Sequence, residues 1–215
     1  WTVMITIVIQ ERVRQILELE GRGPQKDLYL GWILAAGALI STLVCLVVGT
    51  ASDRSRWRMG RRRPYIIAGI LLSAPAFILL PLANSIPLLL FDFCLLQLTV
   101  NAATAPYQAL MPDVVPKERH GTASAYMGLG LLVGQVSGFV LGTKLMARPG
   151  GLWPLSLTLF ALLVGAMLWV VLTVPERSAV DNPAPREGVL ETVADSFRVS
   201  PRRYPDFFWL IASRF

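Results

Sequence analysis

Residues 49–65 read GTASDRSRWRMGRRRPY and place six arginines within the ten residues 54–63, between two long apolar stretches. These stretches, 28–49 and 64–83, each contain about the 20 residues that a helix needs to cross a hydrocarbon core of about 30 Å. Basic residues concentrate in the cytoplasmic loops of membrane proteins. The segment therefore predicts two membrane-spanning helices joined by an arginine-rich cytoplasmic loop, 54–63.

The same alternation of apolar stretches and short connections continues along the chain. We expect complete spans at 28–49, 64–83, 87–111, 122–143 and 152–174, and a partial one at 1–9. Backbone polar groups in lipid must be paired within a helix or a closed barrel, and barrel strands would need a strict two-residue alternation, which these spans lack. The sequence therefore predicts an all-α, multi-pass integral membrane protein of an inner or plasma membrane, with residues 1–174 as its transmembrane bundle.

The connections support this orientation unevenly. Loop 84–86 carries no charge, whereas loop 112–121, which we expect in the cytoplasm, contains Lys117 and Arg119. Segment 11–27, which we expect to be an outside loop, carries four basic residues and fits the rule least well.

The region after the last span has a different composition. Residues 175–206 are rich in proline and charge, which is typical of a cytoplasmic linker. Within it, Val189, Val193 and Phe197 recur every four residues, as in a short helix lying on the membrane surface, and a linker without membrane contact is an equal alternative. Another apolar segment opens at 207–215 and is expected to start a seventh helix, so the chain is expected to be incomplete.

Composition excludes several classes of protein. The chain is 54% hydrophobic and 16% charged, with a mean hydropathy of +0.55. Its net charge of +6 lies in short runs between apolar stretches, which indicates contact with a lipid bilayer and not with nucleic acid. His120 is the only histidine, and we expect Cys45 and Cys94 to pack in the core, so no metal site and no cofactor are expected. No enzyme is expected either, because the sequence has neither a phosphate-binding loop nor a His–acid pair.

The segment 49–65 resembles the signature loop of the major facilitator superfamily. The usual pattern has one residue between Asp-Arg and Gly-Arg-Arg, and here residues 55–59 intervene, which is similar to sucrose transporters and to the glycoside-pentoside-hexuronide:cation symporters. This resemblance implies the six-helix N-terminal half of a twelve-helix transporter, built from 3+3 inverted repeats. An internal echo agrees with such repeats, because GALISTLVCLVVGT at 37–50 is similar to GLLVGQVSGFVLGT at 130–143.

In this superfamily the signature loop is implicated in conformational exchange. Physically, Asp53 at a helix end can accept hydrogen bonds from Arg61 or Arg62 and lie against a helix N-terminus in the C-terminal half of the transporter. Arg56, Arg58 and Arg63 are expected to fix topology and to anchor to lipid phosphates. The resemblance assigns gating to a set that also includes an acid just after the expected helix at 87–111: Gly49, Asp53, Arg54, Gly60, Arg61, Arg62 and Asp113.

A polar stripe marks a candidate solute-binding surface. Residues Gln97, Asn101, Thr104 and Gln108 are spaced by four, three and four, so they share one helical face. Uncharged amides and hydroxyls suit sugar hydroxyl groups, and the alternative is plain hydrogen bonding between helices. Gln135, on a helix with glycines at every fourth position, could reach the same cavity or bond to a neighbouring helix.

The stretch NAATAPYQALMPD at 101–113 is also similar to the corresponding helix of sucrose transporters. It departs from that family at two positions, with Gln108 in place of an arginine and Gln97 in place of a membrane-embedded aspartate. These departures argue against sucrose itself and against a proton site at Gln97.

Asp92 is the only acid well inside an expected span, and an intramembrane carboxylate is a functional candidate because of its desolvation cost. It lies nine residues before Asn101, on roughly the opposite helical face. Coupling to a proton or to sodium and a hydrogen-bonded structural role both stay open.

The expected function is secondary active transport of a small polar solute, such as a sugar or glycoside with a coupled proton or sodium. Two alternatives stay open. The first is a non-transporting relative, such as a pigment-delivery protein or a receptor, and the second is a passive pore.

Overall fold

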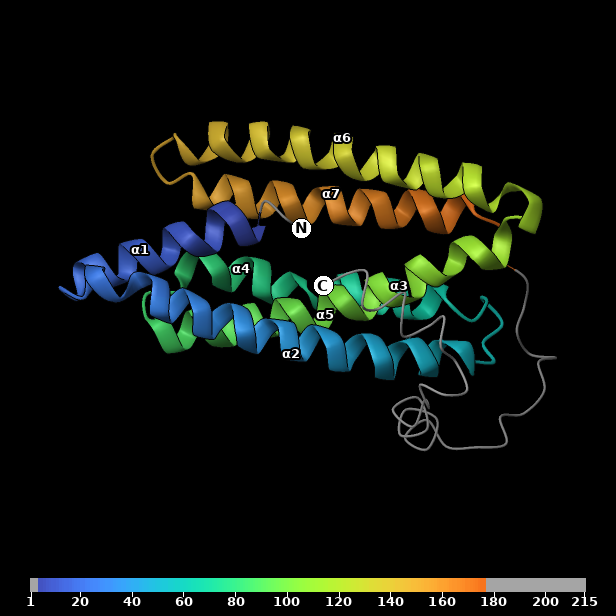
Figure 1. Ribbon diagram of the computed structural model, residues 1–215, viewed down its shortest axis with the longest axis horizontal. Helices are drawn as coiled ribbons and strands as arrows, with labels where there is room; N and C mark the ends of the chain where they lie inside the picture. Colours follow the sequence, from blue (N-terminus) through green and yellow to red (C-terminus); the bar gives the residue numbers. More distant parts are fainter. Residues whose placement is uncertain (1–3, 177–215) are drawn as a thin grey trace, which may run out of the picture.

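The computed structural model describes residues 4–176, with side chains from Ile7 onward, and every regular element in this part of the chain is a helix (Figure 1). The prediction of an all-α fold is therefore confirmed. Most of the expected linker, its stripe of Val189, Val193 and Phe197, and the expected helix start at 207–215 lie outside the described residues. The helices are η1 (Met4–Ile9, a π-helix), α1 (Gln10–Leu19), η2 (Gly23–Gln25), α2 (Lys26–Asp53), α3 (Arg63–Leu72), α4 (Ala74–Leu82), α5 (Ile86–Val114), η3 (Lys117–Arg119), α6 (His120–Met146) and α7 (Leu152–Thr173).

Five segments among the described residues are long and apolar enough to cross a membrane. They are Gly23–Asp53, Arg63–Leu82, Ile86–Val114, Lys117–Met146 and Leu152–Thr173. The helices run along the long axis of the molecule (Figure 1), as required if each is to span the same bilayer.

The span expected at 64–83 consists of two helices. α3 ends at Leu72 and α4 begins at Ala74, with Ser73 between them. Pro75 lacks a backbone N–H, and its ring clashes with the carbonyl of Leu71 in a regular helix, which explains the interruption. The Ser73 hydroxyl donates to the carbonyl of Ile70 at 2.6 Å, so this polar group is satisfied inside the bundle.

The prediction of a loop at 11–27 is wrong for residues 11–19, because α1 continues to Leu19. Arg14 forms ion pairs with Glu11 at 2.6 Å and with Glu18 at 3.0 Å, one helical turn away on either side. Apolar residues on another face of α1, including Ile16 and Leu17, are buried. The charged residues that suggested a loop are therefore the polar face of an amphipathic helix.

α5 is the central helix of the bundle and packs on α2, α3 and α4. Its buried side chains include Leu89, Phe93 and Leu96, which join the main hydrophobic core with residues of α1, α2, α4 and α7. Two glycines allow this close packing. A Cβ on Gly37 of α2 would lie 2.3 Å from the Phe93 ring, and a Cβ on Gly69 of α3 would lie 2.7 Å from the backbone of α5.

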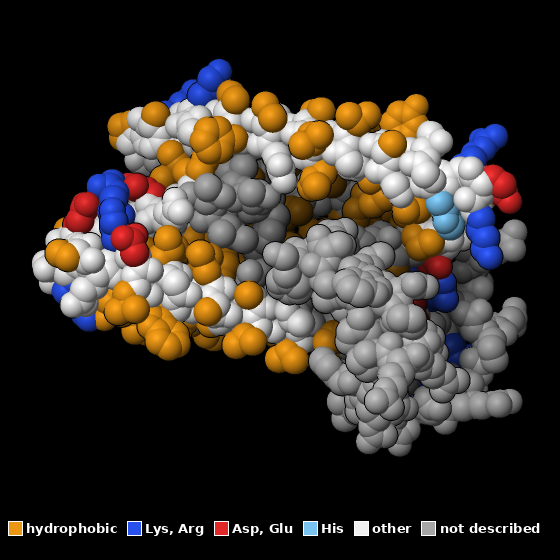
Figure 2. All heavy atoms as spheres, in the orientation of Figure 1, with side chains coloured by type: hydrophobic (Ala, Val, Ile, Leu, Met, Phe, Trp, Pro, Cys, Tyr) orange, Lys and Arg blue, Asp and Glu red, His pale blue; other side chains and the backbone are white. Residues whose placement is uncertain are grey.

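Charged and apolar side chains are separated along the molecule. In the face shown in Figure 2, Lys, Arg, Asp and Glu gather at the two ends of the long axis, and hydrophobic side chains cover the length between. α2 and α6 are the least covered of the long helices, and Gly142 is the only buried residue of α6. This distribution is that of a bundle surrounded by hydrocarbon at its middle and by water at its ends.

Candidate functional site

The guanidinium of Arg62 is the centre of a cluster at the arginine-rich end of the bundle. Its side chain is only 5% exposed, and each of its three nitrogens has a partner. Nη2 pairs with Asp53 at 2.5 Å, Nε donates to Asp113 at 3.0 Å, and Nη1 donates to the hydroxyl of Ser52 at 2.8 Å. A buried charge is tolerated only when it is paired in this way.

This arrangement ties together three helices that are distant in sequence. Arg62 is the N-cap residue of α3, Asp53 is the last residue of α2, and Asp113 lies in the last turn of α5. Arg61 adds a second contact to Asp113 at 2.5 Å, so this carboxylate bridges two adjacent arginines. We call Ser52, Asp53, Arg61, Arg62 and Asp113 the arginine cluster.

A carboxylate from beyond α7 caps the N-terminus of α3. Glu176 accepts hydrogen bonds from the backbone N–H of Arg62 at 2.8 Å and from that of Arg63 at 3.2 Å. These donors have no partner inside the helix, and the helix dipole favours a negative charge there. The Arg63 guanidinium donates to the carbonyl of Val174, so Arg63, for which only topology and lipid contact were expected, is tied to the end of α7.

Gly60 is required by both the backbone and the space around it. Its φ of 101° lies in the left-handed region that favours glycine. A Cβ at this position would lie 2.4 Å from the carboxyl group of Glu176. Gly60 thus lets the loop pass close enough for Glu176 to reach the end of α3.

The other two residues assigned to the gate lie at the edge of the cluster. The carbonyl of Gly49 accepts a hydrogen bond from the Ser52 hydroxyl at 2.9 Å, so Gly49 contacts the cluster through its backbone. Arg54 is the C-cap residue of α2, where its N–H bonds to the carbonyls of Ala51 and Ser52.

Two members of the polar stripe on α5 meet α2. The Asn101 amide donates to the backbone carbonyl and to the side-chain oxygen of Gln97, at 2.8 Å and 2.9 Å. The Cys45 thiol of α2 lies 3.9 Å from Asn101 Oδ1, and Gln97 is 6% exposed beside Gly37. In this structure the two residues therefore take the alternative role, hydrogen bonding at a helix interface.

The remaining candidates for solute binding lie apart from each other. The Thr104 hydroxyl donates to the carbonyl of Val100 in its own helix at 2.8 Å. Gln108 on α5 and Gln135 on α6 are both exposed. Their amides are thus available to groups outside the described bundle.

Asp92 lies inside the bundle, seven residues into α5, and is 0% exposed. Neither carboxylate oxygen has a hydrogen-bond partner among the described residues. An ionised carboxylate without partners is costly in such a place, so Asp92 stays a candidate for a functional role.

Sequence reasoning did not identify Ser52 or Glu176. Glu176 is separated from Arg62 by 114 positions, and the available signal was an acid following the last apolar stretch at the arginine-rich end of the bundle. Ser52 directly precedes Asp53, and its small hydroxyl gave no charge pattern to follow.

Comparison with known proteins identifies relatives with named transport activity. A general alpha-glucoside permease of Schizosaccharomyces pombe is 31% identical over 127 residues, which is 52% of this chain and 23% of that protein. A sucrose transport protein of Arabidopsis thaliana is 27% identical over 138 residues, which is 54% of this chain and 23% of that protein. A sucrose transport protein of Oryza sativa subsp. japonica is 28% identical over 135 residues, which is 53% and 23% of the two chains.

The matched region thus spans about a quarter of the length of these relatives. No solved structure gives a significant match. The family model described as Major Facilitator Superfamily matches residues 21–215 of the chain, and this range includes all five apolar spans in full. The chain is therefore a multi-pass membrane protein that belongs to the Major Facilitator Superfamily.

Proposed function

We propose that this chain forms the N-terminal half of a secondary active transporter that moves a small polar solute by alternating access. The observation that carries the proposal is membership in the superfamily over residues 21–215, together with relatives named as glucoside and sucrose transporters. Such proteins expose a site near the middle of the bilayer to each side in turn by rocking two halves against each other.

The solute class that the relatives suggest is a glucoside. Sucrose and other alpha-glucosides are neutral and rich in hydroxyl groups, and amide side chains can both donate to and accept from a hydroxyl. Gln108 and Gln135 are exposed and can reach such a solute, whereas Gln97 and Asn101 lie at the contact between α5 and α2.

The arginine cluster is the proposed cytoplasmic gate. Its buried Arg62 holds the ends of α2, α3 and α5 together, so that these ends move as one unit when the two halves rock. Asp53 is 55% exposed on its side chain and can still accept a hydrogen bond from the C-terminal half.

Asp92 is the proposed site of cation coupling. Its burial without partners favours uptake of a proton or a cation at a stage of the transport cycle, because either one removes the cost of an isolated charge. Coupling would then link solute movement to a proton or sodium gradient across the membrane.

Uptake by proteoliposomes tests this function. The full-length protein is reconstituted, and accumulation of radiolabelled sucrose, maltose and a small panel of other glycosides is measured with and without an imposed pH or sodium gradient. We expect saturable uptake of at least one neutral glycoside, driven above equilibrium by one of the gradients. Absence of both uptake and counterflow for the whole panel, with a pigment copurifying, would favour the non-transporting alternative.

A further inference from the structure

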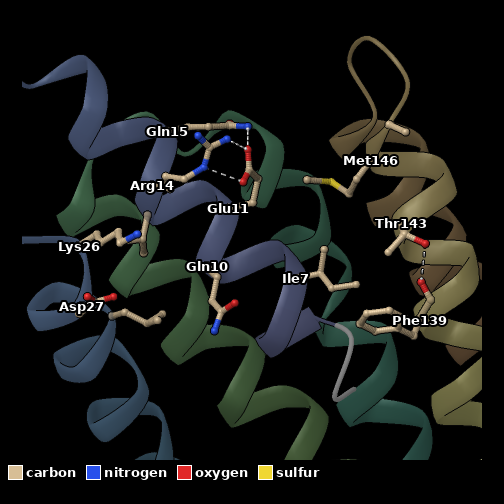
Figure 3. Close-up of a pocket in the computed structure, with 13 residues that line it drawn as sticks. Ile7, Gln10, Glu11, Arg14, Gln15, Lys26, Asp27, Phe139, Thr143 and Met146 are labelled. Carbon is tan, nitrogen blue, oxygen red and sulfur yellow. Dashed lines mark hydrogen bonds and ion pairs between the residues drawn. The ribbon is translucent and has the colours of Figure 1, made fainter. Parts of the chain in front are cut away.

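A cavity lies at the end of the bundle opposite to the arginine cluster. It has a volume of about 790 Å³, in the range of small-molecule sites. Its walls come from the start of the described chain, from the first turn of α2 and from the last two turns of α6 (Figure 3). We call it the α1–α6 cavity, and none of the residues assigned to solute binding from the sequence lines it.

One face of the consecutive helices η1 and α1 is turned toward this cavity. Ile7, Gln10, Glu11 and Arg14 follow the spacing of a single helical face and all line the cavity. The neighbouring face of α1 packs into the hydrophobic core. The cavity wall is therefore held by the same helix that anchors the core, which gives the polar groups fixed positions.

The charges that line the cavity cancel. Glu11 and Asp27 are acidic, whereas Arg14 and Lys26 are basic. Arg14 is also held between Glu11 and Glu18, so its charge is already satisfied by the protein. The lining therefore carries equal numbers of acidic and basic side chains and no net charge, which favours an uncharged solute.

The polar atoms left open suit hydroxyl groups. Among the described residues the Gln10 amide has no hydrogen-bond partner, and its side chain lines the cavity (Figure 3). The Glu11 carboxylate accepts from Arg14 and from Gln15 and keeps further acceptor capacity. On the opposite wall, Thr143 donates to backbone carbonyls of its own helix and can still accept a hydrogen bond.

Apolar side chains complete the site. Phe139 and Met146 of α6 line the cavity opposite α1 (Figure 3). Ligand sites usually combine such apolar walls with a few fixed polar groups. A sugar ring presents an apolar C–H face and a rim of hydroxyls, which matches an apolar wall on α6 and an amide and a carboxylate on α1.

We propose that the α1–α6 cavity is a binding subsite for a neutral polyhydroxylated solute, with Gln10 and Glu11 bonding its hydroxyls and Phe139 packing on its ring. The proposal rests on the transport function proposed above. In that topology the cavity opens toward the outside, so it receives the solute before the solute reaches the middle of the bilayer.

The test is uptake by the full-length transporter in proteoliposomes, with Gln10→Ala compared against Gln25→Ala. Gln25 lies at the same end of the bundle but outside the cavity, which makes it the matched control. We expect Gln10→Ala to raise the KM for the external solute about ten-fold, as for the loss of one or two hydrogen bonds, with little change in maximal rate. Gln25→Ala should leave both parameters unchanged.

A labelling experiment tests the proposal independently, in case Gln10→Ala lowers expression. In protein without Cys45 and Cys94, Gln10→Cys and Gln25→Cys are treated with a maleimide in the presence and absence of solute. Saturating solute should slow labelling at position 10 at least five-fold and leave position 25 unaffected.

The outcomes separate this proposal from the transport function. Uptake by the wild type with an unchanged KM in Gln10→Ala, or equal labelling rates with and without solute, would overturn the subsite and leave transport standing. Uptake restricted to charged solutes would also overturn the subsite. Absence of uptake by the wild type would overturn the transport function itself.

Discussion

Arg62 is the residue on which the candidate gate depends. Its guanidinium is buried, and it bonds to two carboxylates and one hydroxyl from two other helices. Removal of one partner from a buried ion pair is far more damaging than the pair is stabilising, because an unpaired charge remains inside the protein. The two carboxylates differ in exposure, with 25% for Asp113 and 55% for Asp53, so they are expected to differ in importance.

Asp113→Asn and Asp53→Asn test this difference. Both variants should slow uptake with little effect on the KM for solute, because the cluster holds helix ends and lies far from the proposed subsite. We expect a fall in maximal rate of about ten-fold for Asp113→Asn and a smaller fall for Asp53→Asn, whose interaction is screened by solvent. Initial uptake rates in proteoliposomes measure the effect, with the exposed Arg58→Gln as control. Unchanged rates in both variants would remove the gating assignment.

Asp92→Asn tests the coupling assignment at the same scale. The amide has the shape of the acid but cannot ionise, so transport driven by an ion gradient should be lost while solute exchange without a gradient continues. Thermal stability in detergent should stay the same or rise, because a buried group that can ionise is removed. Gradient-driven accumulation equal to that of the wild type would show that Asp92 has a structural role only.

At the scale of elements, the structure differs from the sequence expectations where an interaction joins distant segments. Hydropathy was sufficient to predict the apolar spans, because membrane crossing depends on local composition. The spacing of Gln97 and Asn101 correctly indicated a shared helical face, but it could not indicate that α2 covers that face. The cap that Glu176 forms on α3 could not be predicted either. The sequence around Arg62 carries no signal that identifies a hydrogen-bond partner 114 positions away.

Gly60→Ala is expected to destabilise the N-terminal end of α3. An alanine is strained at a φ of 101°, and its methyl group would displace Glu176 from the backbone N–H groups that it caps. The expected cost is about 1–3 kcal/mol, measured as a lower thermal midpoint in detergent. Gly128→Ala is the matched control, because a Cβ there meets nothing within 4 Å and the residue lies inside α6. A midpoint equal to that of the control would contradict the role of Gly60.

Gly69→Ala tests the packing of α3 on α5. Its Cβ would lie 2.7 Å from the backbone nitrogen of Ala103 and from the carbonyl oxygen of Thr99, and backbone atoms cannot move aside as a flexible side chain can. We expect a cost of about 1–3 kcal/mol, as for other overpacked cores, again seen in the thermal midpoint. Gly134→Ala, on the open face of α6, should be neutral, and equal midpoints for the two variants would contradict this packing.

At the scale of the whole molecule, charge and burial agree with a transporter half. Charged side chains gather at the two ends of the bundle (Figure 2), and the least covered long helices are α2 and α6. The α1–α6 cavity lies at one end and the arginine cluster at the other, which the proposed transport cycle assigns to solute entry and to the cytoplasmic gate. The arginines in the sequence predicted the arginine cluster. The α1–α6 cavity was not predicted, because the residues of α1 were expected to form a loop.

The most direct test of this account is the accessibility of two engineered cysteines in sealed, right-side-out membrane vesicles. In protein without Cys45 and Cys94, Arg58→Cys lies in the arginine-rich loop, and Leu19→Cys lies at the opposite end, where Leu19 is 90% exposed. The account predicts that a membrane-impermeant maleimide labels position 19 in intact vesicles and position 58 only after permeabilisation. Labelling of position 58 from outside in intact vesicles would contradict the cytoplasmic gate.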